Sequence, residues 1–214
     1  MAVLIPDRLA QTGERPAALE TGQYWFACCF VLGWSGVLTA GLSYQFATGY
    51  LPCALSVLQR VFMVLALLAA AMIVRRGLAG GLSSRDHMRG WGMALVACVG
   101  GALVAGRQTM LHVTPGDPGF GGRALGLHLY VWALLLFLAA ILVLGLVMTV
   151  AHRTGEAPGP VRGGAQRFGW FVLVVAGAVI AACVVVTFAQ QGFHARIPGD
   201  PDQYRLFHDL RLKG

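Results

Sequence analysis

Residues 51–60 of the chain read LPCALSVLQR and place a thiol, a hydroxyl and a permanent positive charge on an otherwise apolar segment. Cys53, Ser56 and Arg60 recur at a spacing that puts their side chains on one face of a helix. A thiolate can attack a disulfide, and a guanidinium carries five N–H donors and keeps its charge inside proteins. The segment therefore predicts either a thiol redox site or a site where Arg60 donates hydrogen bonds to a carbonyl group of a ligand.

The elements that position these residues are apolar runs of membrane-spanning length. The chain has 214 residues, of which 57% are hydrophobic and only 12% are charged, and its mean hydropathy is +0.69. A hydrocarbon core of about 30 Å needs about 20 helical residues to cross it, and the runs are far too long for the strands of a membrane barrel. We therefore predict five membrane-spanning helices, at about 23–44, 52–74, 91–111, 125–151 and 168–189.

These helices predict an all-α fold, an integral membrane helical bundle that forms one transmembrane domain over residues 1–214. The short loops predicted inside are rich in arginine, whereas the two outer loops between helices hold only Arg123. Positive charge favours the cytoplasmic side, so we expect a cytoplasmic N-terminus and a periplasmic tail, 190–214, in a bacterial inner membrane. Small residues are expected to let the helices approach closely; they are Gly33, Gly36, Ala40, Gly101 and Ala105.

Arg60 is predicted to lie at shallow depth in the outer half of the bilayer. Counting back about 20 residues from Val74 puts Arg60 about five residues inside the hydrocarbon edge, roughly 7 to 8 Å deep. An unpaired arginine costs a few kcal/mol there, and the carbonyl groups of a quinone would pair with it. An arginine that only snorkels to the interface is the alternative. Arg107 and Gln108, near the outer end of the third helix, are further candidate donors to the same pocket.

His112 and His128 bracket an outer segment rich in turn residues and are candidate ligands as well. They could hydrogen-bond a quinone or another part of the protein, or ligate a haem, which needs only one histidine from each of two helices. Packing at the membrane interface without a ligand is the alternative. Zinc sites show three or four close ligands, and the sequence offers no third one here. We therefore predict no metal site and favour a quinone over a haem. Tyr130 and Trp132 beside them also fit an interfacial aromatic belt.

LPCALSVLQR resembles the Pro-Cys-x-x-Cys-x-x-x-Gln-Arg signature that opens the second helix of the disulfide-bond formation protein B (DsbB) family. GRQTMLH and GLHLYVW, on either side of the outer loop between the third and fourth helices, resemble a five-helix branch with a four-helix core and one extra C-terminal helix. The resemblance implies a membrane thiol oxidase that passes electrons from a periplasmic carrier through a cysteine pair to ubiquinone or menaquinone. It assigns Cys53 to the first cysteine of that pair, Arg60 to the quinone-binding arginine and Gln108 to a polar quinone neighbour.

The chain departs from this pattern at both cysteine pairs. Ser56 replaces the second cysteine of the signature, and serine cannot close a disulfide. Members of the five-helix branch carry another pair in the outer tail, yet no cysteine follows Cys183 here. We expect the other four cysteines to be small core residues of the spans, mostly too far from Cys53 for a disulfide, which needs Cα atoms within about 7 Å; they are Cys28, Cys29, Cys98 and Cys183.

Three functions remain open at this stage. The first and favoured one is a quinone-binding membrane subunit that has lost disulfide chemistry and links a periplasmic redox partner to the quinone pool. The second is an active thiol oxidase that uses Cys53 alone in a mixed disulfide. The third is a non-redox membrane scaffold. The arginines are scattered, so nucleic acid is not a predicted partner, and the tail segment PDQYRLFHDL is expected to dock either on the bundle or on another chain.

Overall fold

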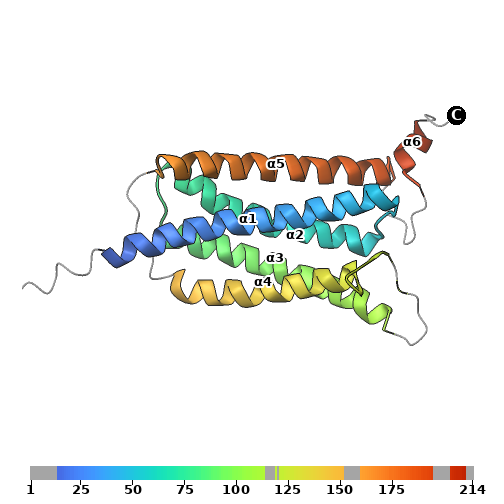
Figure 1. Ribbon diagram of the computed structural model, residues 1–214, viewed down its shortest axis with the longest axis horizontal. Helices are drawn as coiled ribbons and strands as arrows, with labels where there is room; N and C mark the ends of the chain where they lie inside the picture. The colour runs from blue at the N-terminus through green and yellow to red at the C-terminus, as the bar shows by residue number, and fades with distance from the viewer. Residues whose placement is uncertain (1–13, 114–118, 120, 152–159, 195–202, 211–214) are drawn as a thin grey trace, which may run out of the picture.

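In the part of the chain that the structure describes, five long helices run side by side along one axis (Figure 1). The computed structural model describes residues 14–113, 119, 121–151, 160–194 and 203–210. Each long helix contains a stretch that is long and apolar enough to cross a membrane, so the predicted five-span helical bundle is confirmed. The helices are α1 (Glu14–Thr48), α2 (Ala54–Ala79), α3 (Ser84–Leu111), α4 (Leu129–Ala151) and α5 (Gly164–Gln191).

The helices begin and end at turn residues rather than at the limits of the apolar runs. Gly49, with φ +68°, follows the last residue of α1, and glycine is the residue that adopts this left-handed conformation without strain. Ser83 caps α3 through a reciprocal pair of hydrogen bonds with Asp86, which satisfies free N–H groups of the first turn. Most helices are therefore longer than predicted, because hydropathy marks only the part of a helix that lies in hydrocarbon.

One predicted boundary is wrong, because α4 begins at Leu129 rather than at Leu125. The intervening residues form a small hairpin, in which β1 (Arg123–Ala124) pairs antiparallel with β2 (Leu127–His128). Its turn residues Leu125 and Gly126 both have positive φ, 52° and 83°, as a two-residue hairpin turn of type I′ requires. Leucine is unusual in this position, so the turn had only a weak signal in the sequence.

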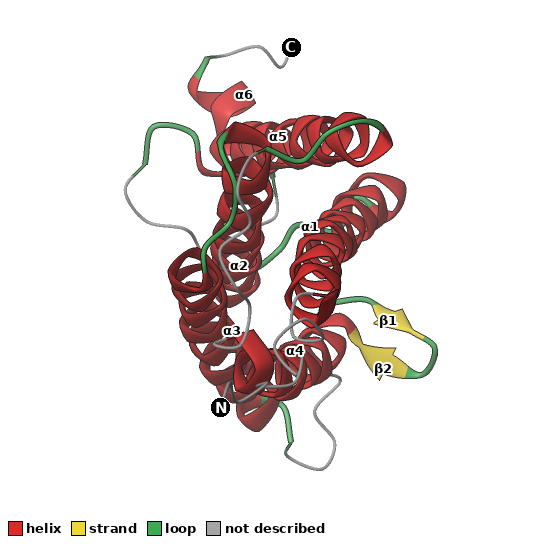
Figure 2. Ribbon diagram, turned by 90° about the vertical axis from the view of Figure 1, so that its left-hand side faces the viewer, coloured by secondary structure: helices red, strands yellow, loops and turns green. Residues whose placement is uncertain are grey.

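Helix α2 lies at the centre of the bundle and packs against three other helices. It contacts α1, α3 and α5, and α3 in turn contacts α4, as the end-on view shows (Figure 2). Gly101 on α3 is covered by the ring of Phe137, which a β-carbon would strike, so its predicted packing role is confirmed. The same prediction is wrong for Gly33 and Gly36, which are exposed on α1 with no atom near a β-carbon position.

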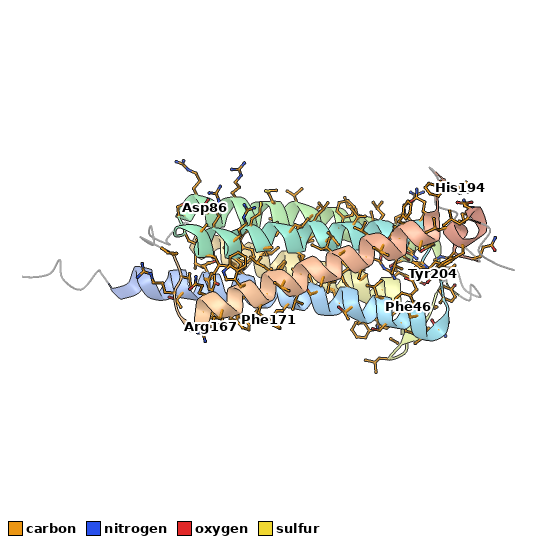
Figure 3. The ribbon with its side chains drawn as sticks, turned by 90° about the horizontal axis from the view of Figure 1, so that it is seen from above. Phe46, Asp86, Arg167, Phe171, His194 and Tyr204 are labelled. Atoms are coloured by element: carbon orange, nitrogen blue, oxygen red, sulfur yellow. The ribbon has the colours of Figure 1, made fainter. Side chains whose placement is uncertain are left out.

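We call the end of the bundle that holds the α1–α2 connection the outer end, following the predicted orientation. Figure 3 shows Tyr204 and His194 at this end, and Asp86 and Arg167 at the opposite end. A short sixth helix, α6 (Arg205–Asp209), lies against α5. Asp209 accepts a hydrogen bond from the backbone N–H of Phe193 at 3.2 Å, so this part of the tail docks on its own chain.

Candidate functional site

A cavity of about 410 Å³ lies near the outer end, between α1, α2 and α4, with the hairpin at its rim. Most of its wall is apolar or aromatic, and a few polar side chains interrupt it. This mixture is typical of pockets that hold small organic molecules, where a few polar groups fix the orientation of the ligand. The polar side chains of the wall are Gln45, Ser56, Gln59, Arg60 and Gln108.

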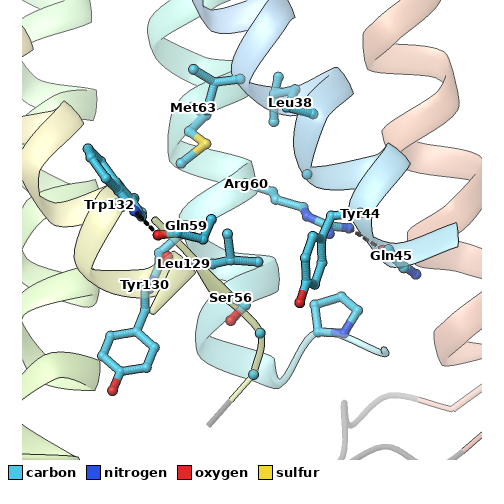
Figure 4. A pocket seen from close by; sticks show the side chains of 18 of the residues that line it. Leu38, Tyr44, Gln45, Ser56, Gln59, Arg60, Met63, Leu129, Tyr130 and Trp132 are labelled. Carbon is cyan, nitrogen blue, oxygen red and sulfur yellow. Dashed lines mark hydrogen bonds between the residues drawn. The ribbon is translucent and has the colours of Figure 1, made fainter. Parts of the chain in front are cut away.

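Arg60 reaches from α2 toward α1, where its Nη1 donates a hydrogen bond to Oε1 of Gln45 at 2.8 Å (Figure 4). Gln45 is only 2% exposed. Among the residues that the structure describes, Gln45 is the one hydrogen-bond partner of the guanidinium. A guanidinium has five N–H donors, so Arg60 keeps donors for a group inside the cavity it lines.

Two buried glutamines, Gln59 and Gln108, form part of the polar wall of the cavity. Nε2 of Gln59 on α2 donates to Oε1 of Gln108 on α3 at 2.7 Å. Nε2 of Gln108 then lies 3.4 Å from Oγ of Ser56. Both amides are nearly fully buried, and burial makes such bonds costly to break. Gln59 and Gln108 are therefore held in fixed orientations at the cavity wall.

Cys53 lies beside this network but is not on the cavity wall. It occupies the N-cap position of α2, and its Sγ is 3.3 Å from Oγ of Ser56 and 3.5 Å from Nε2 of Gln108. The residue is only 7% exposed. A thiol buried to this degree is a poor target for a protein partner, because disulfide exchange requires access to the sulfur.

All five cysteines of the chain are described and all are free. Cys28, Cys98 and Cys183 are buried, as expected for small core residues. The same expectation is wrong for Cys29, which is exposed on α1. The chain therefore contains no intact cysteine pair that could relay electrons from Cys53.

Aromatic residues hold the hairpin against the cavity. Nε1 of Trp132 donates to the backbone oxygen of Ala124 at 2.8 Å. The ring of Tyr44 on α1 lies directly against Gly122, where a β-carbon would not fit. Tyr50 accepts a hydrogen bond from the backbone N–H of Gly121 at 3.0 Å. The outer wall of the cavity is thus built from two segments far apart in sequence.

The remaining candidate residues lie outside the cavity wall. Arg107 is exposed on α3. The ring of His128 stacks on Tyr130, with centroids 5.2 Å apart, and the ring of His112 packs at a tilt against the same tyrosine, 5.6 Å away. Nε2 of His128 accepts a hydrogen bond from Arg123. Tyr130 itself lines the cavity, so the histidines support its wall. Within the described ranges no three His, Cys, Asp or Glu side chains are grouped as a metal site would require.

The cavity reaches the side of the bundle between α1 and α4. Ala40 on α1 and Leu136 on α4 both line it, and both are exposed on the surface of the protein. Since both residues belong to membrane-spanning helices, their exposed surfaces face lipid. A hydrophobic ligand could therefore enter from the bilayer without passing through water.

Gln45 and Tyr44 were not singled out from the sequence, although both lie beside Arg60 in the structure. One signal pointed to Gln45. It is a polar side chain within a long uncharged run, and polar groups in spans are costly unless they bond to another group. The sequence does not show which helix supplies its partner, because that depends on how α1 and α2 pack.

Residues 23–120 match the model of a family described as disulfide bond formation protein DsbB. The match covers the first three spans and includes Cys53, Ser56, Arg60 and Gln108. No curated protein and no solved structure matches the chain.

Proposed function

We propose that the chain, whose first three spans match the DsbB family model, binds a quinone in the outer cavity. The cavity beside Arg60 is the observation that carries the proposal. A snorkelling arginine would extend into water or headgroups, whereas Arg60 bonds to Gln45 within the bundle and lines a mostly apolar space. The volume of about 410 Å³ falls within the range of about 300 to 1,000 Å³ that small-molecule pockets occupy.

The residues of the wall suit a quinone head group. Uncommitted N–H groups of Arg60 are the donors for one of its carbonyl oxygens, and charge-assisted bonds of this kind are stronger than neutral ones. Gln59, Gln108 and Ser56 supply further polar contacts, and Trp132 and Tyr44 supply aromatic surface. The isoprenoid tail would leave through the gap between α1 and α4. A bound quinone accepts two electrons and two protons and becomes a hydroquinone.

We propose that the chain has lost disulfide-forming chemistry and acts as a membrane subunit. Ser56 replaces the partner of Cys53, and Cys53 is buried, so a covalent thiol relay lacks both its second sulfur and its entry point. An outer redox protein would supply the two electrons that reduce the quinone. It would itself be oxidised by the loss of these two electrons. The arginine distribution supports an inner-membrane location with this end facing the periplasm.

Quinone extraction from the purified protein tests the proposal. We expect the wild-type chain to retain quinone, and Arg60→Ala to retain at most about a tenth as much, because a hydrogen bond to a charged group contributes about 1.5 to 3 kcal/mol. Arg107→Ala is the matched control, since Arg107 is an exposed arginine outside the cavity wall. Equal and negligible quinone in all three proteins would leave the non-redox scaffold as the better explanation.

A further inference from the structure

We propose that Tyr204, in the outer tail, is a positioning residue that orients Arg60 toward the cavity through Gln45. The inference rests on the proposed quinone function and adds a residue from outside the segment that matches the family model. Tyr204 immediately precedes α6 and lies in the polar tail that follows the last membrane-spanning helix. It is therefore a contribution of this chain's own C-terminal region to the site.

The three side chains form one hydrogen-bonded series. Nε2 of Gln45 donates to the phenolic oxygen of Tyr204 at 3.0 Å, while Oε1 of the same amide accepts from Nη1 of Arg60 at 2.8 Å. The series thus connects the tail to α1 and α1 to α2. Tyr204 is half-buried and packs on Phe207 of α6, with ring centroids 6.2 Å apart.

The amide of Gln45 can support Arg60 in only one orientation. Its carbonyl oxygen must face the guanidinium, because the NH₂ group would present donors to donors. That orientation turns the NH₂ group of a side chain only 2% exposed toward Tyr204. An unpaired buried donor is costly, so the phenolic oxygen of Tyr204 stabilises the one orientation that holds Arg60 at the cavity.

The tail is anchored independently of this series. Oδ2 of Asp209 accepts from the backbone N–H of Phe193 and lies 3.5 Å from Nδ1 of His194. Gly192, which ends α5 with φ +63°, leaves room for this carboxylate, because a β-carbon there would strike it. Removing only the hydroxyl of Tyr204 should therefore leave α6 docked and change the support of Gln45 alone.

The test is a titration of the full-length protein in detergent with decylubiquinone, followed by quenching of tryptophan fluorescence. We expect Tyr204→Phe to weaken binding about fivefold, the effect of one net hydrogen bond. Tyr24→Phe is the matched control. It removes a hydroxyl that donates to the backbone oxygen of Ala165 at the opposite end of the bundle, and its affinity should equal that of the wild type.

A double-mutant cycle distinguishes positioning from general loosening. In a Gln45→Leu background the amide is absent, so adding Tyr204→Phe should cause no further loss of affinity. Wild-type affinity in Tyr204→Phe, together with a large loss in Arg60→Ala, would overturn this proposal and leave the quinone function intact. A further fivefold loss in the Gln45→Leu background would also overturn it. If the wild-type protein itself does not bind decylubiquinone, the proposed quinone function is wrong, and the role proposed for Tyr204 is wrong with it.

Discussion

The two ends of the bundle use buried polar and aromatic residues differently. At the inner end, Trp91 donates to Gln23 at 2.7 Å, and its ring lies 5.0 Å from that of Phe26. Gly90 there is covered by Ile73, and a β-carbon would strike that side chain. At the outer end, the polar groups border an open cavity, and Arg60 has one hydrogen-bond partner among the described residues.

Under the proposed function, the inner end stabilises the fold and the outer end binds the ligand. Close-packed interiors lose stability when a side chain is added, whereas a pocket tolerates change in its shape and loses affinity instead. The inner end should therefore respond to substitution with reduced folding stability. The outer end should respond to substitution with reduced quinone binding and little change in folding stability.

The largest expected effect is at the inner end, in Gly90→Leu. The new side chain would meet Ile73 and the backbone of Ala69, so we expect a loss of about 2 kcal/mol in the free energy of unfolding, typical of overpacking. Gly92→Leu on the same helix is the control, because no atom lies near its β-carbon position. Thermal unfolding in detergent measures both. Equal midpoints for the two variants would contradict the close packing of this end.

A smaller effect is expected when the cavity is filled from the lipid side. Ala40→Phe places a ring at the gap between α1 and α4, and we expect about a tenfold loss of quinone affinity, equivalent to about 1.4 kcal/mol. Stability should be unchanged, because Ala40 is exposed. Ala139→Phe, on an exposed face of α4 outside the cavity wall, should bind like the wild type. Unchanged affinity in Ala40→Phe would argue against entry at this gap.

The smallest expected effect is that of Cys53→Ser. The hydroxyl can replace the thiol in its contacts with Ser56 and Gln108, and Cys53 is not on the cavity wall. We expect less than about a twofold change in quinone affinity, well below the effect of losing one net hydrogen bond. We also expect unaltered periplasmic disulfide formation in cells where this protein is the sole candidate oxidase. Loss of oxidised substrate in this variant would restore the thiol-oxidase hypothesis.

Much of the fold could be predicted because long apolar runs mark the segments that cross the hydrocarbon core of a membrane. Five apolar runs identified five spans, and the arginine in LPCALSVLQR identified the side chain at the cavity. The hairpin at 123–128 could not be predicted, since its turn has leucine at a left-handed position. Gly36 was expected to pack against a neighbour, yet it is exposed on α1, because the spacing of small residues does not show which face of a helix meets another helix.

The sequence identified Arg60 and Gln108 as residues of the site, but it did not identify the residues that position Arg60. Arg60 and Gln108 come together at the cavity, whereas Arg107, adjacent to Gln108 in sequence, points away from it because successive helical residues face different directions. Gln45 and Tyr204 were missed as site residues, since they contact Arg60 or each other only through tertiary packing across long sequence separations. No periodicity in one helix reports such contacts.

The most direct test of the central claim is photo-crosslinking with an azido-quinone, followed by peptide mapping. We predict that the label attaches to the cavity walls, at residues 37–45 of α1 or 129–136 of α4, and that unlabelled decylubiquinone competes with it. Arg60→Ala should lose this labelling, while Arg107→Ala should keep it. Label spread over the lipid-facing surface of α5, with the same pattern in both variants, would contradict a quinone site beside Arg60.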